Sequence, residues 1–540
     1  MSEPRVLIVG AGPTGLVLAL ELHRQGIPCC VIDKRSAPTN GSKALSINPS
    51  TLDLLNAFGV SERLLKRGVR VRRATVLCND RRISSVDFRR IRDRNRFFLM
   101  LPQPATEAVL TEALTERGGV IERGTAAVGV QQTDEAVTVS MVDSSGRQRE
   151  ERFDYVVGCD GARSEIRHLL GLSFQGADHS LQLALGDVKI AWDRPRDEAF
   201  YVMGDDGFCI VLPLTNDRHR VVVTVDAQRG EPAVVTLATL QERLDACTRS
   251  GAVLSDPSWL SQAPIYTRIA AANRSRRVFL AGDAVHLFSP IGGYGMNTGI
   301  ADAMSLGWRL AYVLRGFAAE TCLQGYEVER MKVAREMVQQ TEISTSLLRR
   351  GTLHSPALEA QWLPRMSNRR LLKALPYQLA GFTQSYNEVN PPTAGRVALP
   401  GCMVPIGERM PAWPHARGVH HLVCTAPRPS DHWPEALAGL RKEYGGMLQI
   451  STLSRHATDI AAPDGQLDCE YGRLVTRYGF PSHGMTLVRP DLYVETITDG
   501  KGSADAMARH LATHYRRDAS GFSAWLDPLA GLLARTTTST

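Results

Sequence analysis

Three short segments rich in glycine and aspartate constrain the fold of this chain more than any other feature. They are Gly10–Gly15, Asp160–Ser164 and Gly282–Asn297, and each follows a short apolar run directly. An apolar run that ends in glycine or aspartate before a helical pattern is typical of a buried strand followed by a tight turn. The carboxyl ends of parallel strands meet at one edge of a sheet. We therefore expect the three segments to lie along one edge and to contact a single extended dinucleotide.

The first segment has the spacing of a dinucleotide-binding turn. An expected strand at Val6–Val9 leads into the turn, an expected helix at Thr14–Gln25 follows it, and Cys29–Asp33 forms a second strand. This pattern predicts a βαβ opening. The start of the helix offers unpaired N–H groups and a partial positive charge to phosphates.

We expect each glycine of this turn to have a different structural role. Gly10 permits the tight turn, Gly12 lets the backbone approach a pyrophosphate, and Gly15 lets the helix pack close to the sheet. Asp33 ends the second strand eighteen residues after Gly15, where its carboxylate is expected to accept hydrogen bonds from a ribose.

The second and third segments place an aspartate at the end of an apolar strand. Asp160 needs partners if it is buried, and we expect these to be Arg163 and the following helix start; an ordinary helix cap explains the segment equally well. Asp283 is expected to hold a ribityl hydroxyl. The turn at Gly292–Gly295 exposes N–H groups that would stabilise negative charge on a reduced flavin ring. His286 is expected to be structural.

The remaining pattern predicts an α/β chain of several domains. We expect a discontinuous Rossmann-like domain, an inserted sheet that strands within 70–102 join, a helical connection, and a C-terminal α/β unit. The corresponding residues are 1–180 with 270–330, 181–269, 331–392 and 393–540.

Composition excludes several classes of protein. The chain is 43% apolar with mixed charges, which is typical of a globular enzyme. Its first residues predict no secretory signal, and no apolar stretch approaches the length of a membrane span. Ten scattered cysteines without a CxxC pair predict reduced thiols, a cytoplasmic protein and no metal site.

The net charge of +7 is unevenly placed, because residues 63–96 hold thirteen basic side chains against three acidic ones. A solvated basic face is the simpler interpretation. The alternative is a surface that attracts an anion, such as a nicotinamide dinucleotide or an acidic substrate. Nucleic acid is disfavoured, since no recognition motif accompanies the charge.

With these motifs in this order, the chain resembles the class A (single-component) flavin-dependent aromatic hydroxylases of the para-hydroxybenzoate hydroxylase fold, especially their phenol and polyketide branch. Two further stretches, Tyr326–Arg330 and Leu487–Val494, extend the resemblance to nearly the whole chain. It implies a Rossmann-like FAD domain, an inserted substrate sheet and a thioredoxin-like C-terminal domain. Without CxxC, that last domain has no dithiol chemistry.

The resemblance implies non-covalent FAD and a set of residues around it. Gln103 matches the family's ribityl-binding glutamine, and Pro290 the proline beside the oxygen-reactive flavin carbon. Lys43 stands where the family has arginine and lacks its bidentate geometry, and Tyr294 stands where glutamine is common. The expected cofactor residues are Gly10, Gly12, Pro13, Thr14, Gly15, Asp33, Lys34, Lys43, Gln103, Asp160, Arg163, Asp283, Pro290, Gly293, Gly295, Met296 and Asn297.

The same resemblance implies the reaction. NAD(P)H reduces FAD, O2 then forms a flavin C4a-hydroperoxide, and its distal oxygen passes to a phenolic or polycyclic aromatic ring. NADPH is preferred because the basic stretch offers a site for the extra phosphate. No residue is identified as a catalytic base. The expected substrate-pocket residues, which plain sheet core explains equally well, are Met203, Phe208, Ile210, Leu212, Pro213 and Tyr294.

Several alternatives stay open at this point. A Baeyer–Villiger or epoxidising monooxygenase on the same fold is the first, and a non-oxygenating flavin-binding protein is the second. A flavin halogenase is disfavoured because the chain lacks WxWxIP, and a disulfide reductase because Cys29 and Cys30 are adjacent. A nicotinamide dehydrogenase would leave the second and third segments unused. The expected state is a monomer or a homodimer.

Overall fold

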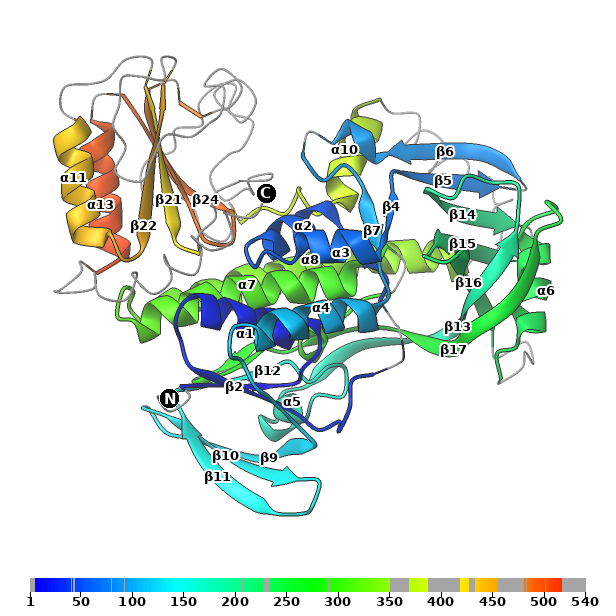
Figure 1. The fold of residues 1–540 in the computed structure, drawn as a ribbon, viewed down its shortest axis with the longest axis horizontal. Helices are drawn as coiled ribbons and strands as arrows, with labels where there is room; N and C mark the ends of the chain where they lie inside the picture. The colour runs from blue at the N-terminus through cyan, green and yellow to red at the C-terminus, as the bar shows by residue number, and fades with distance from the viewer. Residues whose placement is uncertain are drawn as a thin grey trace. The chain divides into compact units, whose positions relative to one another are not determined.

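The computed structural model describes most of the first 349 residues and separate stretches of the remainder. The chain divides into two compact units: Met1–Gly307 with Tyr326–Gln384 and Pro411–Trp413, and Trp308–Gly325 with Ser385–Met410 and Pro414–Thr540. Figure 1 shows the elements of both units. The described residues are 5–39, 41, 44–78, 80–91, 93–204, 207–226, 234–289, 292–349, 369–386, 418–426, 433–454, 480–481, 483–500 and 502–516.

A six-stranded sheet forms the centre of the first unit, in the order β18-β19-β12-β1-β2-β8. All its pairings are parallel except that of β18 at one edge. Every residue of β1, β12 and β19 is buried, as expected for short apolar strands that are covered on both faces. The strands are β1 (Val6–Val9), β2 (Cys29–Asp33), β8 (Ile121–Arg123), β12 (Tyr155–Gly158), β18 (Arg274–Ser275) and β19 (Val278–Leu280).

Different elements cover the two faces of this sheet (Figure 1). Helices α1 (Pro13–Arg24), α4 (Gln103–Thr115) and α7 (Tyr294–Leu314) lie on one face. The other face packs against α5 (Glu165–Leu169) and a three-stranded antiparallel sheet of β9 (Thr125–Gln132), β10 (Val137–Asp143) and β11 (Gln148–Phe153). The mixed α/β class that the sequence predicts is confirmed.

A second, eight-stranded sheet has the order β20-β17-β13-β16-β15-β14-β5-β6. It is antiparallel except between β14 and β5. The long strands β13 and β17 pair from Phe174↔Ala270 to Ala191↔Val253, and so they run from the first sheet into the second. The strands are β5 (Arg73–Cys78), β6 (Arg81–Asp87), β13 (Phe174–Ala191), β14 (Glu198–Gly204), β15 (Gly207–Pro213), β16 (Arg218–Asp226), β17 (Val253–Ala270) and β20 (His286–Leu287).

The two faces of the eight-stranded sheet have separate apolar clusters. One face packs on helix α6 (Leu237–Cys247) through valine-rich positions such as Val202, Val221 and Val223. The opposite cluster contains Leu183, Leu185, Phe208, Ile210, Val222 and Ile265.

Further elements complete the first unit, of which α8 (Cys322–Arg349) begins in residues of the second unit. The small sheet β3-β7-β4 connects the first helices to the eight-stranded sheet. These elements are β3 (Ser46–Ile47), α2 (Pro49–Asn56), α3 (Ser61–Arg67), β4 (Val69–Val71), β7 (Phe98–Met100), the 3-10 turns at Phe88–Arg90 and Gly282–Ala284, α8 (Cys322–Arg349) and α10 (Arg369–Leu379).

The second unit contains a four-stranded sheet in the order β22-β21-β23-β24, in which only β21 and β22 are parallel. Helices α11 and α13 contact each other and this sheet (Figure 1). Trp308 and Tyr312 from the last turns of α7, and Phe317 just after it, share its apolar core. The elements are β21 (His420–Ala426), α11 (Trp433–Tyr444), β22 (Leu448–Ser454), β23 (Gly484–Val488), β24 (Val494–Asp499) and α13 (Ser503–His514). Within the described ranges, no helix has the length and apolar character needed to cross a membrane.

Candidate functional site

The three motif segments begin side by side at the carboxyl edge of the six-stranded sheet. Val9, Gly158 and Leu280 are in register across β1, β12 and β19. The Cys159 N–H donates to the Val9 carbonyl at 2.7 Å, and the Ala281 N–H donates to the Gly158 carbonyl at 2.9 Å. The strand order therefore brings together segments that lie about 120 to 270 residues apart in the sequence.

The first turn requires glycine at two positions and leaves space at a third. Gly10 has a φ of +109°, and a Cβ there would overlap the Cys159 carbonyl. A Cβ on Gly15 would overlap the Gly10 carbonyl oxygen. A Cβ on Gly12 would meet nothing within 4 Å, and Gly12 begins α1 without a side-chain cap. The space and the uncapped helix start fit a pyrophosphate, which helix N–H groups bind well.

Asp33 lies at the end of β2, buried to 4% exposure. One carboxylate oxygen accepts from the Ala11 N–H at 2.9 Å and the other from the Arg35 N–H at 2.8 Å, and the Arg35 guanidinium contacts both. Burial alone would raise the pKa of Asp33, but these hydrogen bonds hold it below its usual value. The side chain of Lys34 is exposed.

Polar side chains from two other elements, α4 and β8, lie near Asp33. Gln103, at the start of α4, accepts from the Ala44 N–H at 3.3 Å and donates to Glu107 at 2.8 Å. Arg123 is in register with Asp33, and its Nη1 is buried without a hydrogen-bond partner in the described part of the chain. Burial raises the pKa of Glu107. Sequence analysis did not identify Arg123, which has no motif of its own.

The second segment acts as a helix cap. Both oxygens of Asp160 are used: one accepts from the Ser164 hydroxyl at 2.5 Å and the other from the Glu165 and Ile166 N–H groups. Burial raises the pKa of Asp160. The helix start is therefore its partner, as expected, whereas Arg163 is exposed and is not among the hydrogen-bond partners of Asp160 in the described part of the chain.

Arg167, which sequence analysis missed, connects the second and third segments. Its guanidinium donates to the carbonyls of Ala162 and Ala284, both at 2.9 Å, and lies 3.8 Å from the centre of the Phe174 ring. Phe174 begins β13, so this arginine contacts both motifs and the first residue of a strand of the second sheet. The sequence shows only an arginine in a short helix, without any indication of these partners.

The Gly282–Asp283 turn packs against the start of α1. Gly282 has a φ of +64°, and its added Cβ would lie 2.6 Å from the Thr14 hydroxyl. Asp283 lies beside the start of α7, because a Cβ on Gly295 would be 3.9 Å from its carboxylate. Thr14 therefore packs closely against the third segment. This contact leaves little space for a larger side chain at position 14.

The start of α7 is fixed by Asn297. Its side chain accepts from the Asn48 N–H at 3.0 Å and donates to the carbonyls of Ser46 at 2.9 Å and Gly293 at 2.7 Å. Gly292 and Gly293 both have positive φ, so the turn before the helix depends on glycine. Met296 is half-buried. Two of the expected cofactor residues, Lys43 and Pro290, lie outside the described residues.

Most of the expected substrate residues share one face of the eight-stranded sheet. Phe208 and Ile210 belong to its second apolar cluster, with Met203 and Leu212 packed against them. Strand alternation places Pro213 on the opposite face from Leu212. The cluster also includes Tyr201, which sequence analysis missed. Burial raises the pKa of Tyr294, and the Tyr201 phenol raises it further.

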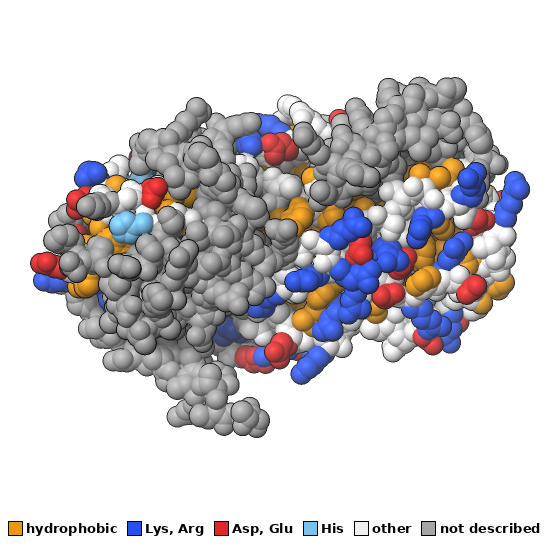
Figure 2. Space-filling model, turned by 90° about the horizontal axis from the view of Figure 1, so that it is seen from above, with side chains coloured by type: hydrophobic (Ala, Val, Ile, Leu, Met, Phe, Trp, Pro, Cys, Tyr) orange, Lys and Arg blue, Asp and Glu red, His pale blue; other side chains and the backbone are white. Residues whose placement is uncertain are grey.

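Four of the thirteen basic side chains in the stretch 63–96 form close ion pairs with acidic side chains, which favours the solvated-face interpretation. Figure 2 shows Lys and Arg side chains interleaved with Asp and Glu over one face of the molecule. The pairs are Arg63–Glu116 at 2.6 Å, Arg67–Glu112 at 3.0 Å, Arg73–Glu198 at 2.7 Å and Arg89–Asp87 at 2.7 Å.

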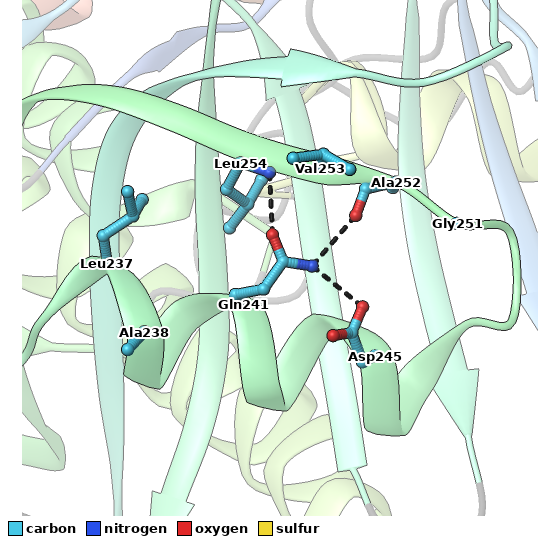
Figure 3. Close-up of a pocket in the computed structure, with 8 residues that line it drawn as sticks. All are labelled: Leu237, Ala238, Gln241, Asp245, Gly251, Ala252, Val253 and Leu254. Carbon is cyan, nitrogen blue, oxygen red and sulfur yellow. Dashed lines mark hydrogen bonds between the residues drawn. The ribbon is translucent and has the colours of Figure 1, made fainter.

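A surface groove of about 640 Å³ lies away from these motifs, between α6 and the first residues of β17. Figure 3 shows that Gln241 spans it: its amide accepts from the Leu254 N–H and donates to Asp245 and to the Ala252 carbonyl. Because these bonds occupy the Gln241 amide, the groove offers mainly apolar side chains and no cofactor motif.

Comparisons with known proteins agree with this geometry. The FAD binding domain family matches residues 3–341, more than half of the chain. The chain therefore belongs to the FAD binding domain family.

Named relatives of the chain are monooxygenases. It is 31% identical over 536 residues to 6-methylpretetramide 4-monooxygenase of Streptomyces rimosus, covering 95% of this chain and 94% of the relative. It is 29% identical to pentachlorophenol 4-monooxygenase of Sphingobium chlorophenolicum, covering 91% and 93%. The structure of anhydrotetracycline hydroxylase from Streptomyces rimosus superposes with a TM-score of 0.75 at 27% identity, covering 94% of this chain and 98% of that one. The resemblance to class A aromatic hydroxylases is thereby confirmed.

Proposed function

We propose that this protein is an FAD-dependent monooxygenase that uses NAD(P)H and O2 to hydroxylate a phenolic or polycyclic aromatic substrate. The observation that carries the proposal is the meeting of three motif segments at one edge of the sheet, in a chain whose family binds FAD. The reduced flavin and O2 supply the oxygenating chemistry when FAD is bound, and the protein positions the reactants and excludes water.

In this proposal FAD lies along the edge formed by β1, β12 and β19. The turn at Gly10–Gly15 holds the pyrophosphate, Asp33 the adenosine ribose, and Gln103 and Asp283 the ribityl chain. Lys34, Lys43 and Asp160 support the ADP half. The residues at Pro290 and Gly293–Asn297 adjoin the flavin ring. The open space at Gly12 and the free nitrogen of Arg123 support this assignment.

We assign the nicotinamide co-substrate to the exposed side of the second segment, and we prefer NADPH. Arg163 is exposed there, whereas Arg167 is engaged by two carbonyls. Arg163→Ala is expected to slow flavin reduction by NADPH while leaving FAD affinity unchanged. Anaerobic stopped-flow reduction and an FAD titration measure the two quantities separately. Unchanged reduction together with lost FAD would make Arg163 a structural residue instead.

We assign the substrate to the face of the eight-stranded sheet that carries Phe208, Ile210, Met203 and Tyr201. This face is apolar, with the phenols of Tyr201 and Tyr294 at its margin. Such a surface suits a flat aromatic ring that bears a hydroxyl group. Relatives of the chain are named as monooxygenases of 6-methylpretetramide, anhydrotetracycline and pentachlorophenol, and these names support the same class of substrate.

We also propose that residues 393–540 form a thioredoxin-like domain and that residues 181–269 form the substrate domain. A βαβ unit followed by a ββα unit in the second unit supports the first assignment. The C-terminal domain lacks CxxC, so we give it no redox role.

The test is a screen of phenols and hydroxylated polycyclic compounds for stimulated NAD(P)H oxidation, with products analysed after reaction in ¹⁸O2. One labelled oxygen atom in a hydroxylated product is the expected result. A ring-expanded or ester product from a ketone would favour Baeyer–Villiger chemistry instead. NAD(P)H oxidation without product across the whole screen would favour a flavin-binding protein that does not oxygenate.

A further inference from the structure

A buried carboxylate lies directly behind the Gly282–Asp283 turn. Asp302, on α7, is 1% exposed. One of its oxygens accepts from the Gly282 N–H at 3.0 Å and lies 2.7 Å from His286 Nε2. The other accepts from Arg330 Nε at 2.6 Å. A single carboxylate thus joins the turn, strand β20 and helix α8.

The surroundings of this carboxylate fix the turn from several sides. Arg330 is 2% exposed and also donates to the Thr298 carbonyl at 3.3 Å. One helical turn earlier, the Tyr326 hydroxyl donates to the Leu280 carbonyl at 2.6 Å. Thr14 packs against Gly282. The strand end and the turn that carries Asp283 are therefore held by both α8 and α7.

A neutral side chain of the same size would not replace Asp302. Three donors converge on it, and a carboxylate has two acceptor oxygens, whereas asparagine has one acceptor oxygen and an NH2 group. A buried ion pair contributes little net stability compared with apolar packing, but removing one partner leaves a costly unpaired charge. The carboxylate at position 302 is therefore better explained by the need to hold three donor groups in place than by a gain in the stability of the fold.

Through His286, Asp302 is also connected to the eight-stranded sheet. Its backbone lies in β20, which pairs with β17 through Ile269↔His286 at the edge of the eight-stranded sheet. Its ring stacks on Phe288 at 4.7 Å and is 1% exposed. The other ring nitrogen, Nδ1, is buried without a hydrogen-bond partner among the described residues, so the contact with Asp302 is made through Nε2.

We propose that Asp302, with Arg330 and His286, is a positioning residue that holds the Gly282–Asp283 turn in its cofactor-binding geometry. The inference rests on the proposed function, because that function assigns the turn to FAD. Burial alone would raise the pKa of Asp302, but Arg330 and His286 lower it below its usual value, so the carboxylate stays ionised at neutral pH.

The first test separates positioning from simple charge compensation. Asp302→Asn removes the carboxylate that accepts from Arg330, whereas Asp302→Asn/Arg330→Gln removes both charges. We expect the double variant to melt close to the wild type without FAD, and both variants to bind FAD at least tenfold more weakly. Recovery of wild-type FAD affinity in the double variant would overturn the proposal, because Asp302 would then only neutralise Arg330.

A second pair of variants keeps the test decisive if Asp302→Asn does not fold. His286→Gln retains an N–H donor toward Asp302, and His286→Leu removes it. We expect FAD affinity near that of the wild type in the first and a severalfold loss in the second, with a changed visible spectrum of the bound flavin. Equal affinity and identical spectra in the two variants would contradict the role of His286.

The matched control is Asp491→Asn in the second unit. Asp491 is another buried carboxylate paired with an arginine, Arg489 at 2.5 Å, and its ion-pair partners in the described part of the chain, Arg489 and Arg309, lie outside the three motifs. We expect a lower melting temperature and unchanged FAD affinity. If the wild-type chain binds no FAD, the proposed function fails; if the wild type binds FAD and the Asp302 variants bind equally well, only this inference fails.

Discussion

Gly12 and Gly15 lie three residues apart in one turn, yet their replacement by alanine should act by different routes. A Cβ on Gly15 overlaps the Gly10 carbonyl, so Gly15→Ala is expected to distort the turn and lower the melting temperature of the FAD-free protein. A Cβ on Gly12 meets open space at an ordinary φ of −80°, so Gly12→Ala should fold normally. It should nevertheless weaken FAD binding roughly tenfold, about 1.4 kcal/mol, because the Cβ enters the pyrophosphate space.

Thermal melting without FAD and a fluorescence titration with FAD measure the two effects. Gly146→Ala, in the exposed turn between β10 and β11, is a control for the general cost of replacing a glycine, since its φ of +86° makes alanine unfavourable there as well. Normal FAD affinity in Gly12→Ala would show that the pyrophosphate does not bind at this turn.

Asp283 is expected to contribute to FAD binding through its charge. A hydrogen bond to a charged acceptor contributes about 1.5–3 kcal/mol, so Asp283→Ala should weaken FAD binding about tenfold or more without preventing folding. Asp505→Ala, on the exposed first turn of α13, is the matched control and should leave FAD affinity unchanged. Equal FAD affinities in the two variants would show that Asp283 does not bind the ribityl chain.

At the scale of elements, the second unit joins its strands and helices through a buried polar cluster. Glu495 on β24 lies 2.7 Å from His420 Nε2, 2.9 Å from His510 Nε2 and 3.0 Å from the Tyr515 hydroxyl. The Tyr312 hydroxyl lies 3.0 Å from His420 Nδ1. Burial alone would raise the pKa of Glu495, but the two histidines hold it well below its usual range.

This cluster predicts a loss of stability in acid. A carboxylate whose pKa is lower in the folded than in the unfolded chain stabilises the fold above the unfolded value, about 4.3 for glutamate. That contribution is lost as the pH falls from there through the folded value. We expect Glu495→Gln to melt lower than the wild type at pH 7, with a smaller further decrease below about pH 4.3. Melting temperatures measured from pH 7 to pH 3 test this prediction. If the melting temperatures of the wild type and of Glu495→Gln fall equally with pH, Glu495 does not cause the loss of stability in acid.

The elements differ in how well their sequence predicts them. The βαβ opening is confirmed within one residue, as Val6–Val9, Pro13–Arg24 and Cys29–Asp33, because short apolar strands and a glycine turn are local signals. Helix α6 was not predicted within the strand-rich region, although Thr236 and Thr239 form a capping box before it. The 18-residue β17 was also missed, since its half-exposed residues show little apolar alternation.

For the whole molecule, we expect the purified protein to be yellow and to hold one FAD per chain. The chain has a single set of the three segments, and the resemblance suggests no histidine or cysteine that would bind the flavin covalently. Denaturation in acid should release all the flavin into the supernatant, where its absorbance gives the ratio of FAD to protein. A colourless protein that FAD does not reconstitute would contradict the proposed function, and flavin that stays with the precipitate would contradict non-covalent binding.

The sequence by itself determined the motif turns and the family of this protein. Gly10 is specified by its φ of +109° and Gly15 by its contact with the Gly10 carbonyl, and such local requirements leave a recognisable spacing. Only the tertiary structure decided which side chains meet behind those turns. Asp302, His286 and Arg330 come from separate elements, Arg167 contacts Ala284 more than 100 positions away, and burial together with Tyr201 of the eight-stranded sheet raises the pKa of Tyr294 at the start of α7. Strand order and register determine these contacts, and the local spacing of residues predicts neither of them.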